Sequence, residues 1–300
     1  MPVRRLPPSE RLSPGDVPPG VFLPQQLGAA GSAVLRLVAE YGVLDTDQVA
    51  VALGMSRPTA HRRLTALTDS GLLYRSRENS RSHRNRYELA PDGLATMAVW
   101  MSRDRRLHLP DLAQRAHPLP GGRGKQDVIN RFFLAVAEHG RRAGTGVLHR
   151  WLHRVDANRW LADQGLRNAR CDGYGVYVTL DDDAAGTAAA VAFTLHWAVT
   201  HTPGDDPRGN PALDPAVILA GYDRSVRLDV ALVVTAGITE EADWLAYAVA
   251  HAVPVRIATT SEDLLRIEPD GPAGPIWATA NSVGDAGSHR VRLSGLSSGR

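Results

Sequence analysis

Lysine and cysteine are almost missing from this chain. Lys125 is the one lysine and Cys171 the one cysteine in 300 residues. A single cysteine excludes an intrachain disulfide and any zinc site built from several thiolates. Long apolar runs are missing too, so no segment could span a bilayer, and the N-terminus lacks the apolar stretch of a secretory signal. We therefore expect a cytoplasmic protein that does not associate with membranes.

Positive charge is concentrated in one short stretch, although the chain as a whole is nearly neutral. The formal net charge is +2, from 34 basic and 32 acidic residues. Between Arg57 and Arg86, however, eight arginines stand against two acidic residues, Asp69 and Glu78. Such local asymmetry says more about partners than the net charge does, and it indicates a polyanionic partner.

Three short helices are predicted before and within this basic stretch. Apolar residues at helical spacing indicate the first helix over 31–41. A second helix is predicted over 45–54, with a capping side chain at its start and a glycine at its end. For the third helix, over 56–71, Ser56 is the expected N-cap and Pro58 fits the first turn.

A hairpin with a basic tip follows the third helix. The runs 72–76 and 86–90 have the composition of strands, and the segment between them is polar and rich in arginine. A further helix begins at Pro91. Three helices followed by such a hairpin are typical of a winged helix-turn-helix.

The outward face of the third predicted helix carries side chains suited to DNA recognition. Ala60, Leu64 and Leu67 recur at helical spacing and would pack inward, which turns Arg62 and Thr65 outward. Such groups can reach base edges in the major groove, while arginines of the wing can reach phosphates. We therefore predict double-stranded DNA as the partner. The candidate DNA-binding residues are Arg57, Thr59, His61, Arg62, Arg63, Thr65, Arg75, Arg77, Arg81, Arg84 and Arg86.

The second half of the chain has the pattern of an α/β (α+β) domain. A long amphipathic helix is followed by strand-like and helical runs in the order α-β-β-β-α-β-α-β. The expected division is a proline-rich disordered arm over 1–27, the winged helix over 28–103, a linker over 104–124, the α/β domain over 125–268 and a flexible tail over 269–300.

Seven stretches carry a family pattern. They are "VLDTDQVAVALG", "SRPTAHRRLTALTDSGLLYR", "RYELAPDG", "VINRFFLAVAEHGR", "CDGYGVYV", "ILAGYDR" and "LDVALVVTAG". Together they resemble the replication-relaxation protein family of actinobacteria and their mobile elements. The resemblance implies a role in replication and relaxation of plasmid DNA, and it makes replication or conjugation proteins candidate partners.

The same resemblance implies a restriction-endonuclease-like second domain, in which an aspartate and a later acid-x-Lys pair hold Mg²⁺. Asp172 can stand for the first aspartate, and Glu138 on the preceding helix could supplement it. The strand expected to carry the acid-x-Lys pair offers Thr194 and His196 instead, and Lys125 is far away in sequence. We therefore expect no nuclease activity, no cofactor and no metal ion.

The sequence thus predicts a non-enzymatic, sequence-specific double-stranded DNA-binding protein of the nucleoid. A homodimer is expected, because one winged helix reads only a short half-site. It would act in replication, maintenance or transcriptional control of an actinobacterial chromosome or mobile element. The alternatives are a ligand-responsive winged-helix transcription regulator, a Mg²⁺-dependent DNA nuclease, a winged helix that binds protein, and arginines that are merely a solvated surface.

Overall fold

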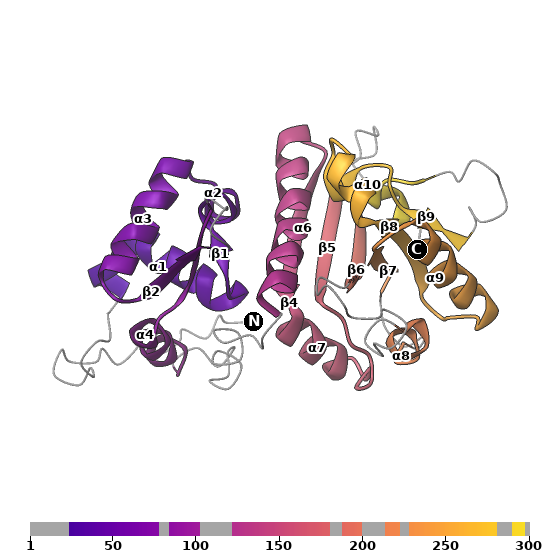
Figure 1. The fold of residues 1–300 in the computed structure, drawn as a ribbon, viewed down its shortest axis with the longest axis horizontal. Coiled ribbons are helices and arrows are strands. Elements are labelled where there is room, and N and C mark those ends of the chain that lie inside the picture. Colours follow the sequence, from indigo (N-terminus) through magenta and orange to yellow (C-terminus); the bar gives the residue numbers. More distant parts are fainter. Residues whose placement is uncertain are drawn as a thin grey trace, which may run out of the picture.

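The N-terminal part of the chain and a larger α/β part lie side by side in the computed structural model (Figure 1). The structure describes residues 24–77, 84–102, 122–180, 188–199, 214–222, 228–280 and 290–297. Most of the expected arm, most of the expected linker and the tip of the wing lie outside these ranges. Of the helices in the described ranges, none has both the length and the apolar character that crossing a membrane requires.

The N-terminal part is a winged helix-turn-helix. Its elements are α1 (Pro24–Tyr41), β1 (Leu44–Asp45), α2 (Thr46–Leu53), α3 (Arg57–Asp69), β2 (Leu73–Arg77), β3 (Asn85–Leu89) and α4 (Pro91–Ser102). The three strands form one antiparallel sheet in the order β1-β3-β2. Three helices followed by a two-stranded wing is the arrangement that the sequence predicts.

Local signals explain why α2 and α3 begin and end where they do. The Asp45 carboxylate accepts a hydrogen bond from the Gln48 backbone N–H (2.8 Å), and Gln48 Oε1 accepts one from the Asp45 N–H (2.7 Å). This capping box starts α2, and Gly54 ends it in the left-handed conformation (φ 60°). Ser56 caps α3 by accepting from the Thr59 N–H (3.4 Å).

Helix α1 begins earlier than the sequence predicts. The sequence assigns residues 24–27 to the disordered arm, but they belong to α1, which contains a kink at Gly28 (φ 66°, ψ 170°). Pro24 is compatible with this start, since the first position of a helix needs no backbone donor. Leu27 then packs against the core of the winged helix, and this burial of apolar surface stabilises the additional turn.

The core of the winged helix lies between its four helices and the sheet. Ala60, Leu64 and Leu67 of α3 are buried in it, as predicted, together with Val34 and Leu35 of α1. Burial of this face leaves the opposite face of α3 to the solvent.

The α/β domain contains one mixed sheet of six strands, covered on both faces. Its elements are α6 (Gly122–Ala143), β4 (Gly146–His153), α7 (Arg154–Asp163), β5 (Gly173–Leu180), β6 (Ala188–Ala198), α8 (Pro215–Leu219), β7 (Val230–Thr235), α9 (Ile238–Ala250), β8 (Arg256–Ser261), α10 (Glu262–Ile267) and β9 (Ala278–Thr279), with 3₁₀ turns at Gly271–Ala273 and Leu293–Leu296. The strand order is β4-β5-β6-β7-β8-β9. Strands β6, β7 and β8 are parallel, and the other neighbours are antiparallel. The predicted order of elements lacks α7, α10 and β9.

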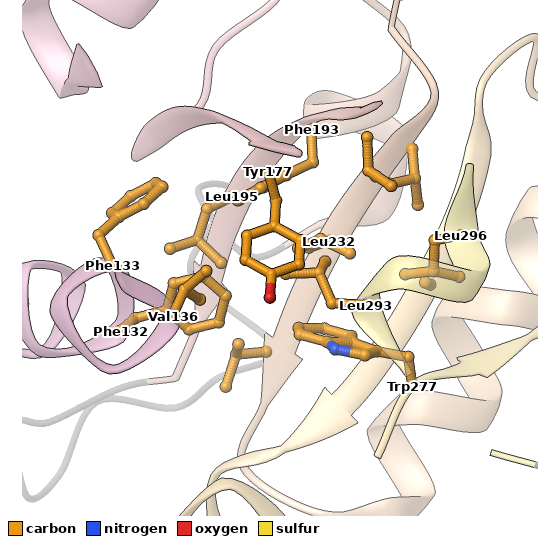
Figure 2. Packing of buried hydrophobic residues seen from close by; sticks show 14 of the residues in the cluster. Phe132, Phe133, Val136, Tyr177, Phe193, Leu195, Leu232, Trp277, Leu293 and Leu296 are labelled. Carbon is orange, nitrogen blue, oxygen red and sulfur yellow. The ribbon is translucent and has the colours of Figure 1, made fainter. Parts of the chain in front are cut away.

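Side chains of β7 alternate between two cores, one on each face of the sheet. Val230, Leu232 and Val234 join the core beneath α6, whereas Ala231 and Val233 join the core beneath α7, α8 and α9. Figure 2 shows the first of these cores, where Phe132, Phe133 and Val136 of α6 approach Tyr177, Phe193 and Leu195 of β5 and β6. A strand buried on both faces needs an apolar residue at every position, which explains the continuous run of β7.

The prediction of a flexible tail over 269–300 is wrong for the described residues of that range. Trp277 is fully buried, and Ile276, Leu293 and Leu296 belong to the core beneath α6. Strand β9 adds a sixth strand to the sheet, and Trp277 Nε1 donates to the Pro272 carbonyl (2.8 Å). Composition suggested a tail, but within the described residues Gly271–Ala273 and Leu293–Leu296 form 3₁₀ turns beside the core.

Candidate nucleic-acid interface

The outward face of α3 presents its polar side chains to the solvent. His61 and Arg62 are exposed, and Arg63 and Thr65 are partly exposed. Arg62 lies opposite the buried Leu64, whereas the other three flank it, and the hydroxyl oxygen of Thr65 is buried. All four lie in the first half of the helix or its middle. In a winged helix this is the part of the recognition helix that meets base edges.

Arg57, at the start of α3, forms an ion pair with α2. Its Nε lies 2.6 Å from Asp47 Oδ1, and the two side chains are 73% and 51% exposed. Exposed pairs of this kind contribute little to stability, commonly below about 1 kcal/mol. The guanidinium of Arg57 is therefore free to exchange this carboxylate for a phosphate oxygen at small cost.

The wing contributes Arg75 in the middle of β2 and Arg84 just before β3, next to the tip. Arg75 is exposed on β2, and its cross-strand partner is Tyr87, so it lies on the face of the sheet that α3 covers. Arg84 is exposed beside the start of α2, with Nη1 3.9 Å from Asp45 Oδ2. The side chain of Arg77 and the whole of Arg81 lie outside the described residues.

Arg86 differs from the other predicted DNA-binding residues, because its side chain is largely buried. Its side chain is 11% exposed, and Nη2 lies 2.9 Å from Asp127 Oδ2 on α6. The cause is the alternation of side chains along β3, because Tyr87 faces the core of the winged helix and its neighbour must face the other way. That other face meets α6, so Arg86 joins the winged helix to the α/β domain and does not lie on the outward face with the other arginines.

Asp127 is the centre of the contact between the two domains. Besides Arg86, it pairs with Arg131 one turn further along α6 (2.7 Å) and accepts a hydrogen bond from Gln48 Nε2 (3.1 Å). Burial raises the pKa of the Asp127 carboxyl, and the guanidinium groups of Arg131 and Arg86 oppose that rise. With two guanidinium groups this close, we assign Asp127 as ionised at neutral pH.

A stripe along α6 extends this contact. Its residues, Asp127, Asn130, Leu134, Ala137 and Arg141, alternate steps of three and four and therefore share one face of the helix. Asn130 Nδ2 donates to the backbone carbonyls of Tyr41 and Val43 (3.1 Å each), and Arg141 Nη2 donates to that of Val51 (3.1 Å).

The opposite side of α6 carries the apolar residues that cover the sheet. Helix α6 therefore lies between the winged helix and the sheet and contacts both (Figure 1). An aromatic stack adds to the contact, with Trp151 of β4 lying 4.0 Å from Tyr41 and 5.1 Å from Phe133 between ring centroids.

The structure places Lys125 beside Asp172, although the two are far apart in sequence. Lys125 Nζ lies 2.9 Å from Asp172 Oδ2, and the same carboxylate accepts a hydrogen bond from the Trp197 backbone N–H (2.8 Å). Glu138 does not join them. It lies almost four turns further along α6, about 20 Å at roughly 1.5 Å per residue, and it is exposed. Its expected role as a supplement to Asp172 is therefore wrong.

The side chains near Asp172 do not fit a magnesium site. Thr194 and His196, which the sequence has on β6 where the resemblance implies the acid-x-Lys pair, both bond to Tyr222 (2.9 Å each). Magnesium prefers several hard oxygen ligands, whereas this group offers one carboxylate that is already paired with an ammonium. Within the described residues, no group of three or more His, Cys, Asp and Glu side chains could hold a metal ion.

His196 predicts a pH dependence of stability. It is 2% exposed, and burial lowers its pKa to about 4. The unfolded chain has the ordinary value of about 6.5, so between these values only the unfolded state binds the proton. His196 therefore does not lower the free energy of unfolding above about pH 6.5. As the pH falls below this value, the free energy of unfolding decreases, and the loss reaches about 3 kcal/mol at pH 4.

Urea unfolding at pH 7 and pH 4.5 measures this effect. His196→Gln should remove most of the difference between the two pH values, whereas His149→Gln, at an exposed histidine, should leave it unchanged. An equal loss of stability in wild type and His196→Gln would contradict the assignment.

The fold defines a winged helix-turn-helix protein in which the winged helix is docked on an α/β domain. Residues 35–198, more than half of the chain, match the replication-relaxation family. The chain therefore belongs to the replication-relaxation family, as the sequence motifs suggest. No match was found among curated proteins.

Several solved structures are similar to parts of the chain. The homodimeric winged helix-turn-helix DNA-binding domain of a possible ArsR-family regulator from Mycobacterium bovis is 27% identical, over 28% of this chain and 75% of that chain, with a TM-score of 0.24. The transcriptional regulator SlyA is 18% identical, over 40% of this chain and 84% of that chain, with a TM-score of 0.26. The archaeal chromatin protein TrmBL2 is 12% identical, over 78% of this chain and 73% of that chain, with a TM-score of 0.21.

Proposed function

We propose that this protein binds double-stranded DNA and reads its sequence with α3, without catalysing a reaction. The observation that carries the proposal is the exposed pair His61 and Arg62 on α3, together with the exposed Arg75 and Arg84 of the wing. A guanidinium in the major groove recognises guanine by two hydrogen bonds, and arginines of a wing contact phosphates.

Membership of the replication-relaxation family supports a role in the replication or maintenance of DNA. We propose that the molecule works as a homodimer, because a single α3 reads only a few base pairs and two copies double the contacts at fixed spacing. The target would then be an inverted repeat, in a chromosome or a mobile element. Sedimentation of the protein with and without such a repeat measures the stoichiometry.

We propose further that the α/β domain is an endonuclease-like sheet without nuclease activity. Asp172 stands at the start of β5, next to β6, which supports the likeness. The ion pair of Asp172 with Lys125, and Thr194 and His196 in place of the acid-x-Lys pair, argue against Mg²⁺-dependent cleavage.

One experiment tests binding and cleavage together. Purified protein is mixed with fragmented genomic DNA, with and without Mg²⁺, and the retained fragments are sequenced. We expect intact fragments that share a repeated half-site. Cut ends that depend on Mg²⁺ and disappear in Asp172→Ala would support the nuclease instead, and retention of no preferred sequence would contradict sequence reading by α3.

Substitutions on the DNA face should separate base contacts from phosphate contacts. Arg62→Ala should weaken binding by about 1–3 kcal/mol and relax the preference at one base position. Arg75→Ala should weaken binding to all sequences alike and reduce the slope of log K against log salt by about one. Fluorescence anisotropy with a set of single-base variants at several salt concentrations measures both effects.

Arg266→Ala is the matched control, because Arg266 is an exposed arginine on α10, paired with Asp263. It should bind as the wild type does. If Arg62→Ala behaved like this control, α3 would not be the element that reads bases.

A further inference from the structure

A cavity of about 520 Å³ lies between the winged helix and the α/β domain. Its walls come from four elements of both parts: Leu37 and Tyr41 of α1, Val51 and Ala52 of α2, Leu134, Ala137 and Arg141 of α6, and Val147, Leu148, His149 and Trp151 of β4. Domain contacts are normally packed as densely as the protein interior. The space is open to solvent on one side, and its volume lies within the range of roughly 300–1,000 Å³ found for small-molecule sites.

The lining is apolar except at the rim. Leucine, valine and the Tyr41–Trp151 stack form the walls, and Val147 is 54% exposed beside them. The charged group is Arg141, whose guanidinium donates one hydrogen bond to the Val51 carbonyl (3.1 Å) and has further N–H groups to offer. His149 is exposed next to it. Glu138, the nearest acid along α6, does not line the cavity.

From this lining we propose that the cavity binds an amphipathic organic anion, with an apolar body against Leu134 and Val147 and an acidic group at Arg141. The aliphatic side chains and the edges of the stacked rings favour an apolar body, and a guanidinium forms strong charge-assisted hydrogen bonds with carboxylate or sulfonate groups. A neutral apolar molecule fits the walls but leaves the Arg141 guanidinium without its anion.

The position of the cavity links its occupant to the DNA face. Val51 and Ala52 of the cavity wall belong to α2, which packs directly against α3. A bound molecule that moves the walls apart would shift α2 relative to α6. Because α2 packs against α3, the orientation of α3 relative to the α/β domain would change as well. This link rests on the proposed DNA binding, whereas the binding site itself does not.

The binding site is tested without DNA, using the full chain and two fluorescent probes with the same apolar body. Anilinonaphthalene sulfonate carries an acidic group, and phenylnaphthylamine lacks it. We expect saturable binding of both, with the sulfonate preferred. Arg141→Gln should raise the Kd of the sulfonate probe about tenfold and leave that of the neutral probe unchanged.

Two variants fill the cavity from opposite walls, and a third is their control. Ala137→Trp on α6 and Ala52→Phe on α2 should each abolish binding of both probes, provided that urea unfolding shows a folded protein. Ala246→Trp, on an exposed position of α9 outside the cavity, should bind as the wild type does. Unchanged binding in both filling variants, or no preference for the sulfonate, would overturn the proposal.

DNA binding is then measured at saturating sulfonate probe. A changed Kd in the wild type, but not in Ala52→Phe, would support the link through α2, and an unchanged Kd would overturn it. If the protein bound no DNA under any condition, the proposed function would fail, while the probe titrations would still decide whether the cavity is a binding site.

Discussion

Asp127→Ala is expected to lower the free energy of unfolding by about 3–5 kcal/mol. The substitution leaves the guanidinium of Arg86, whose side chain is 11% exposed, without its carboxylate, and it removes the acceptor of Gln48 Nε2. Breaking a buried pair costs more than the pair contributes, because the remaining charge stays desolvated. Urea unfolding at pH 7 measures the change.

Two further variants test the reason for this loss. Asp263→Ala removes a carboxylate from the exposed pair with Arg266 and should change the free energy of unfolding by less than about 0.5 kcal/mol. The double variant Asp127→Leu with Arg86→Met replaces the pair by apolar side chains and should recover much of the lost stability. A loss below about 1 kcal/mol in Asp127→Ala would contradict the central role of Asp127 in docking.

Trp277→Ala is expected to destabilise the α/β domain by about 3–5 kcal/mol. The indole is fully buried, packs edge to face with Phe132 of α6 at 6.1 Å between ring centroids, and donates to the Pro272 carbonyl. Its removal leaves a cavity in the core that Figure 2 shows. Loss of near-ultraviolet circular dichroism during thermal unfolding measures the effect.

The control for this substitution is Ile267→Ala, at the end of α10, where the side chain is 72% exposed. It should change the unfolding temperature little. A chain that ends after residue 268 should not fold at all, because it lacks β9 and the residues after it that complete the core beneath α6. If Trp277→Ala unfolded at the wild-type temperature, the segment after residue 268 would be a tail, as its composition suggests.

The winged helix could be predicted from the sequence because its signals are local. Asp45, Gly54 and Ser56 mark the ends of helices through contacts within a few residues, and the spacing of Ala60, Leu64 and Leu67 fixes the inward face of α3. Local rules of capping and periodicity suffice for such features.

Contacts between distant residues could not be predicted in this way. Nothing near Arg86 in the sequence shows that its partner is Asp127, or that Lys125 meets Asp172. The strand alternation that places Tyr87 inside does imply that Arg86 faces away from the core, so part of this correction was available from the sequence. The positive charge of Arg86 did not reveal this, because the sequence does not distinguish an exposed arginine of a basic wing from an arginine in a buried ion pair.

The stripe on α6 also limits how this architecture can diversify. A DNA-reading domain on a free linker can be exchanged for another as a unit, because few contacts cross the boundary. Here Asp127 and Asn130 of α6 bind Gln48, Arg86 and the Tyr41 carbonyl of the winged helix. A foreign domain that lacks these partners would not dock. Substitutions on the outward face of α3 leave these contacts with α6 unchanged. New DNA preferences are therefore expected to arise by changes within α3, not by exchange of whole domains.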